Sequence, residues 1–118
     1  MSDLAYNLSV VKSKDKALVV EHGEIKSPPL SVEARREAGF YLRKLQQGES
    51  LSMPVSRPMP SIGTNCHELR IDDRDSFWRI IYKIYDNAIV VLEVFNKKSN
   101  QTPKQIINNC KARIRRLQ

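Results

Sequence analysis

The sequence has few of the residues on which common catalytic sites depend. Its 118 residues include two histidines, two cysteines and four glycines. It has no Gly-rich phosphate loop, no Cys-x-x-Cys pair, no His-Glu-x-x-His motif and no nucleophile elbow. His22 and His67 alone do not make a convincing metal site. We therefore expect that any catalysis uses no metal and no cofactor and relies on positioned charges.

Long apolar runs are also missing. No run approaches the roughly 18 residues of a membrane span. Residues 1–8 lack a basic region followed by a continuous apolar stretch, which argues against a signal peptide. Two cysteines, Cys66 and Cys110, fit a reduced protein with free thiols, one or both of them buried. We expect a cytoplasmic protein without membrane contact.

Acidic residues are absent from the C-terminal end. Residues 1–93 hold thirteen basic and thirteen acidic side chains, whereas residues 94–118 hold seven basic side chains and no acidic one. The whole net charge of +7 therefore lies in the last segment. Such a patch attracts nucleic acids and acidic proteins. Cations near a helix C-terminus complement its dipole, which accounts for Arg113, Arg115 and Arg116 but not for Lys97 and Lys98.

The apolar pattern predicts an α+β fold with one core, because a chain of this length holds one domain. We expect a polar arm over residues 1–16 and a single domain over residues 17–118. The predicted elements are a strand at 17–22, a helix at 32–47, an irregular segment at 48–63, strands at 66–71, 77–85 and 88–95, and a helix from 102 onward. Together they predict an antiparallel sheet of about four strands, flanked by an N-terminal helix or helical hairpin and a C-terminal helix.

The helix ends carry recognisable signals. Ser31 can cap the first helix and Gly48 can stop it. In the last helix, Thr102 is a suitable N-cap, Pro103 fits the first helical position, and Gln105 completes a capping box. The predicted buried stripe of that helix consists of Ile106, Ile107, Cys110, Ile114 and Leu117.

The strands at 66–71, 77–85 and 88–95 form a predicted meander, in which each strand pairs with the next. Along its middle strand, successive side chains point to opposite faces of the sheet. Trp78, Ile80, Tyr82 and Ile84 share one parity and form the predicted core face. Arg79 has the other parity, so we expect it nearer solvent. Arginine is an uncommon choice inside a strand. Its recurrence on neighbouring strands suggests either a face that receives phosphate or a solvated outer face.

Several motifs, in order, carry a family resemblance. They are Glu68-Leu69-Arg70, Trp78-Arg79-Ile80-Ile81-Tyr82, Val94-Phe95-Asn96-Lys97-Lys98 and Thr102-Pro103. The chain resembles the RelE/HigB superfamily of toxin–antitoxin toxins from about residue 17 to residue 118, and most closely its phage-derived HigB-like branch. The resemblance implies a RelE-like fold and a ribosome-dependent mRNA endoribonuclease that inhibits translation. It also implies a cognate antitoxin, mRNA and the ribosome as partners.

The resemblance assigns roles to individual residues. Arg79 would contact the scissile phosphate, and Arg70 would be a second phosphate contact. Lys97 and Lys98 would bind the RNA backbone. Arg57, in the irregular segment, could reach a phosphate or be solvated, and solvation is the favoured expectation.

Proton transfer leaves His67 and Glu68 as candidates, because the last helix has no tyrosine or histidine. The two lie on opposite strand faces, so at most one points into the site. His67 could equally be a polar residue at a strand edge, and Glu68 could form an ion pair with Arg70.

Two other functions fit the same residues. One is a ParE-like toxin, which shares the fold and inhibits DNA gyrase. The other is a non-catalytic module of prophage origin that binds nucleic acid or a protein partner.

Overall fold

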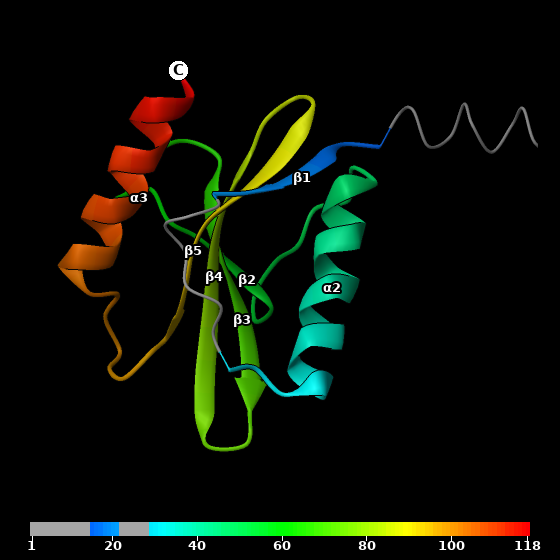
Figure 1. The fold of residues 1–118 in the computed structure, drawn as a ribbon, viewed down its shortest axis with the longest axis vertical. Coiled ribbons are helices and arrows are strands. Elements are labelled where there is room, and N and C mark those ends of the chain that lie inside the picture. Colours follow the sequence, from blue (N-terminus) through cyan, green and yellow to red (C-terminus); the bar gives the residue numbers. More distant parts are fainter. Residues whose placement is uncertain (1–14, 22–28) are drawn as a thin grey trace, which may run out of the picture.

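Helices lie on both faces of a five-stranded sheet (Figure 1). The structure, a computed structural model, describes residues 15–21 and 29–118. Residues 1–14 of the predicted arm and residue 22 of the first predicted strand lie outside this range. In chain order the elements are β1 (Ala17–Val20), α2 (Val32–Gln46), β2 (Ser56–Pro58), β3 (Cys66–Asp73), β4 (Ser76–Ile84), β5 (Ala88–Asn96) and α3 (Lys104–Leu117).

The sheet is mixed, in the order β1-β5-β4-β3-β2. β1 runs parallel to β5, and the other neighbours are antiparallel. The α+β class and the three meander strands are confirmed. The predicted antiparallel sheet of about four strands is confirmed only in part: most neighbours are antiparallel, but β1 is parallel to β5, and β2 adds a fifth strand. Pro58 is compatible with β2 because this strand forms a sheet edge, where a missing N–H is tolerated.

α2 covers one face of the sheet. Ser31 is its N-cap and accepts a hydrogen bond from the Ala34 amide at 3.0 Å. Gly48 follows the helix with φ of +90°, a conformation that glycine adopts without strain, so both predicted end signals are confirmed. The first core combines helix and strand residues: Ala34, Ala38, Leu45, Leu69, Ile71, Trp78, Ile80, Tyr82, Ile89 and Val91.

α3 covers part of the opposite face, where it packs on β5. A second core lies there, made of Met59, Ile62, Cys66, Ile81, Val90, Leu92 and Cys110. The central strands are therefore buried on both faces. The prediction for β4 included a core on one face only. Both cysteines are free and buried, as expected.

Two details of α3 differ from the prediction. Leu117 is 39% exposed, while Arg113 is buried and donates to the Leu92 carbonyl and the Glu93 carboxylate. The helix starts one residue later than a Thr102 N-cap would place it. Its N-cap is Pro103, and no side chain caps it. The Thr102 hydroxyl donates to Glu68 instead.

Among the described residues, neither helix has the length and apolar character that a membrane span requires.

Candidate functional site

A cavity of about 340 Å³ opens on the face that α3 leaves uncovered. Residues from β2, β3 and β4 and from the segment that follows β5 line it. They are Arg57, Arg70, Phe77, Arg79, Lys97, Lys98, Ser99 and Asn100. Five of these eight side chains are cationic, and none of the eight is acidic.

Strand register brings these cations together. Arg57 on β2 pairs with Glu68 on β3, and Arg70 on β3 pairs with Arg79 on β4. Like charges directly opposite each other in a sheet are destabilising. An arginine pair at this position therefore suggests that the face is built to receive an anion.

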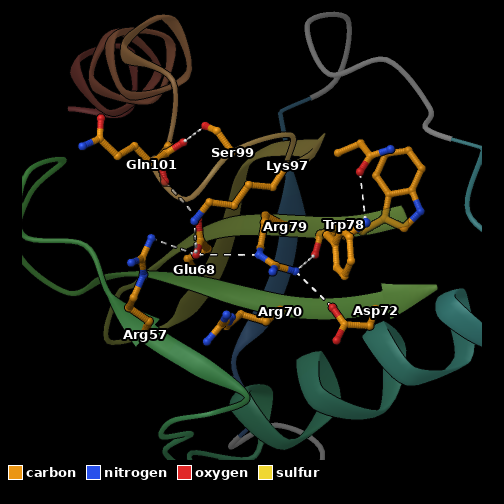
Figure 2. Close-up of polar contacts among 12 residues, drawn as sticks. Arg57, Glu68, Arg70, Asp72, Trp78, Arg79, Lys97, Ser99 and Gln101 are labelled. Atoms are coloured by element: carbon orange, nitrogen blue, oxygen red, sulfur yellow. Dashed lines mark hydrogen bonds and ion pairs between the residues drawn. The ribbon is translucent and has the colours of Figure 1, made fainter. Parts of the chain in front are cut away.

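Glu68 is the organising residue of the site and is fully buried. Its Oε1 atom lies 3.2 Å from Nη2 of Arg57, 3.6 Å from Nζ of Lys97 and 3.9 Å from Nε of Arg79 (Figure 2). Its Oε2 atom accepts a hydrogen bond from the Thr102 hydroxyl at 3.1 Å. One carboxylate thus orients three cations and fixes the segment that precedes α3.

Arg79 is buried, with 5% of its surface exposed. Its parity relative to the core face of β4 is as predicted, but the expectation that it lies nearer solvent is wrong. Lys97 and Glu68 lie against it (Figure 2). Nη1 donates to the Trp78 carbonyl at 2.9 Å and lies 3.5 Å from Oδ1 of Asp72. Within the described residues its buried Nε makes no hydrogen bond, and it lies 3.9 Å from Oε1 of Glu68.

The two lysines differ in environment. The Lys97 side chain is 8% exposed, and this burial lowers the pKa of its ammonium group. The Glu68 charge raises that pKa and the charges of Arg57 and Arg79 lower it, with burial the largest effect. Lys98 is exposed at the rim of the cavity.

The remaining predicted residues fall in three places. Arg57 points to Glu68 and not only into solvent, although its side chain is still 37% exposed. Arg70 lines the cavity, and no described carboxylate lies within ion-pair distance of it, so the alternative of a Glu68–Arg70 pair is not formed. His67 lies on the α2 face, stacked on the Tyr82 ring at 5.3 Å, and burial lowers its pKa.

Sequence reasoning missed four contributors: Phe77, Ser99, Asn100 and Thr102. The last carried a misleading signal, because a threonine before a proline is also a good helix cap. A second hollow of about 370 Å³ shares Arg57 and Asn100 with the first and continues along the Met59 and Gln101 side. The two hollows form one groove beside the start of α3.

The cations of this groove have the chemistry that recognises phosphate esters. Arginine forks match two phosphate oxygens, and buried cations with unused donors bind anions strongly. The cations that line the first hollow are three arginines and two lysines. The chemistry that these groups support is the neutralisation of a developing negative charge on phosphorus.

The family comparison agrees with the phage-derived character of the resemblance. The family model described as "Phage derived protein Gp49-like (DUF891)" matches residues 28–115, which is more than half of the chain. No curated protein and no solved structure matches this chain. The matched range contains every residue of the cavity. The chain therefore belongs to the phage-derived Gp49-like family, which is of the RelE/HigB toxin type.

Proposed function

We propose that this protein is the toxin of a toxin–antitoxin pair and cleaves mRNA on the ribosome without a metal ion. The observation that supports this most directly is the convergence of Arg57, Arg70, Arg79 and Lys97 on one cavity around a buried carboxylate. A RelE-like arrangement of the α+β fold and the HigB-like branch form part of the same proposal.

RNA supplies its own nucleophile, so the protein has to orient and neutralise rather than form a covalent bond. The 2′-hydroxyl attacks the adjacent phosphorus while the bond to the 5′ oxygen breaks. Arg79 and Arg70, opposite each other on β4 and β3, hold the two non-bridging oxygens in this scheme. The charge that grows on these oxygens then relieves the repulsion between the two guanidinium groups.

The exposed cations extend the site. Lys98 at the rim and Arg57 between the two hollows would hold phosphates on either side of the scissile one. An acidic segment of a cognate antitoxin would be attracted to the same groove and would block it. Inhibition and substrate binding would then compete for one surface.

The test is inducible expression of the wild type and of Arg79→Ala in a bacterial host, with growth and mRNA 5′ ends measured together. Arg36→Ala is the matched control, because this arginine is exposed on α2, which covers the opposite face of the sheet. We expect growth arrest and new 5′ ends for the wild type and the control. In Arg79→Ala, cleavage should fall by about 100-fold or more, the usual loss when one transition-state donor is removed.

Other outcomes select the other functions. Arrest without new 5′ ends, together with DNA damage, would indicate a ParE-like gyrase inhibitor. No arrest from soluble wild-type protein would indicate a non-catalytic binding module of prophage origin.

A further inference from the structure

We propose that Lys97 is the general acid of the cleavage reaction and gives its proton to the 5′ oxygen of the leaving nucleotide. This inference rests on the proposed nuclease function and assigns the proton-transfer group that the sequence left open. It stands on the position of Lys97 in the cavity and on the chemistry of the residues around it.

The position of Lys97 suits a proton donor. The side chain runs past Arg79 and ends with its ammonium group at the Glu68 carboxylate (Figure 2), and Lys97 and Arg79 both line the cavity. Nζ is 3.6 Å from the Glu68 carboxylate, and the same oxygen is 3.9 Å from Nε of Arg79. An ammonium group held beside the phosphate-binding arginine can reach an oxygen of the phosphate that Arg79 holds.

The other residues at the cavity are poor proton donors. The arginines keep their protons at all relevant pH values. Phe77, Ser99 and Asn100 do not titrate in this range. His67 lies on the other face of the sheet, and Lys98 is exposed at the rim. Glu68 is fully buried, with one oxygen facing three cations and the other bonded to Thr102.

The environment of Lys97 favours release of its proton. Burial lowers its pKa, the neighbouring charges of Arg57 and Arg79 lower it further, and the Glu68 charge opposes them. A donor whose pKa moves toward the working pH is a more effective general acid. Glu68 has a second role here, because it holds the ammonium group in place until the leaving oxygen accepts the proton.

The proposed step is balanced in atoms and charge. Hydroxide from solvent removes the 2′-hydroxyl proton, and the 2′ oxygen forms a bond to phosphorus. The bond between phosphorus and the 5′ oxygen breaks as the Lys97 ammonium proton moves to that oxygen. The products are a 2′,3′-cyclic phosphate, a 5′-hydroxyl and a neutral Lys97 amine, which water then reprotonates.

The experiment compares two substrates on ribosomes programmed with mRNA. One has the natural 5′ oxygen at the cleavage site, and the other has sulfur there, a leaving atom that needs no proton. Wild type, Lys97→Arg and Lys97→Met are assayed across pH, with Lys104→Arg as the matched control. Lys104 is exposed at the start of α3 and does not line the cavity. Thermal unfolding checks that each variant is folded.

For the wild type and the control, we expect the oxygen-substrate rate to rise with pH and level off above the Lys97 pKa, since the acid is then deprotonated. The sulfur-substrate rate should rise throughout. Both Lys97 variants should lose about 100-fold or more on the oxygen substrate, the usual contribution of an acid or base. On the sulfur substrate, Lys97→Arg should come within a few-fold of wild type.

Two results would overturn the inference in distinguishable ways. If Lys97→Arg slows both substrates equally, Lys97 binds or positions the RNA and does not donate the proton. If the wild type cleaves neither substrate, the nuclease function itself is wrong, and the assignment of Lys97 fails with it.

Discussion

At the scale of single residues, Glu68 is the most consequential side chain. A carboxylate loses its hydration when it is buried, and only well-placed opposite charges offset that loss. Here Arg79 and Lys97 are also almost fully buried, so they depend on Glu68 as much as it depends on them. Removing its charge would take the carboxylate partner from Lys97 and leave Arg79 with the exposed carboxylate of Asp72 at 3.5 Å.

We predict that Glu68→Gln lowers the free energy of unfolding by about 3 kcal/mol, the usual cost of breaking a buried ion pair from one side. Glu49→Gln is the control. Glu49 also pairs with a lysine, Lys44, but the Glu49 side chain is 52% exposed and that of Lys44 34%, so the loss of this pair should cost less than about 1 kcal/mol. Urea denaturation at neutral pH measures both values.

Inorganic phosphate extends this measurement. It should raise the unfolding temperature of Glu68→Gln more than that of the wild type, since a bound anion supplies the missing charge. Equal increases would contradict the view that the cavity is an anion site organised by Glu68.

At the scale of secondary-structure elements, the start of α2 is fastened to the end of β3. The amide and the hydroxyl of Ser31 both donate to Asp73, at 3.0 and 2.7 Å. The same hydroxyl accepts from Ala34, so it caps the helix as well. The hydrogen bonds from Ser31, its side chain first and its amide second, lower the pKa of the Asp73 carboxyl.

A depressed carboxyl pKa predicts a pH-dependent stability difference. The Asp73 contribution should be complete above its unfolded pKa of about 4 and should disappear as pH falls through the lower folded pKa. Asp73→Asn should therefore be less stable than wild type at pH 7, and the gap should narrow by pH 2–3. A gap that does not change with pH would contradict the interaction.

Loss of the cap itself is a separate effect. Ser31→Ala should cost about 1 kcal/mol, as is usual for an N-cap serine. Denaturation at pH 7 measures this cost.

At the scale of the whole molecule, the two faces of the sheet are covered differently. α2 covers one face over the first core, while α3 shares the other face with the groove. Cys66 and Cys110 lie in the second core, and burial raises the pKa of both thiols, to about 12 for Cys110. Their reactivity therefore reports whether α3 stays on the sheet.

We predict that Cys110 reacts very slowly with an aromatic disulfide reagent at pH 8 in the native protein. With a pKa near 12, only about one thiol in ten thousand is ionised at that pH, because each pKa unit is a factor of ten. Both cysteines should react rapidly in denaturant. Native reaction at the rate of a free peptide thiol would show that α3 detaches readily.

Much of the fold could be predicted from the sequence because local patterns encode it. The helix at 32–47 and the three meander strands were found within two residues of their observed ends. The parallel pairing of β1 with β5 joins segments about seventy residues apart, and no local pattern encodes such a pairing. β2 was missed because it has three residues, one of them Pro58, and such a short segment carries no strand signal.

The sequence predicted which side chains form the candidate site but not how deeply they are buried. The family motifs indicated Arg70, Arg79, Lys97 and Lys98, and all of them line the cavity. The burial of Arg79 depends on Lys97 and on the segment before α3, which come from a distant part of the chain. The use of Thr102 by Glu68 depends on the same tertiary arrangement.

The shared carboxylate also affects how RNA binding should respond to salt. Each phosphate that a free cation neutralises on a single strand releases about 0.7 of a counterion, which makes binding weaken as salt rises. Glu68 is already a counterion for Arg57, Arg79 and Lys97, and it belongs to the protein. One carboxylate offsets one of these three positive charges, so binding should weaken with salt less steeply, by about one charge, than five free cations would predict. An RNA site of this kind would select its substrate partly by fit to one phosphate and not only by general attraction to polyanions.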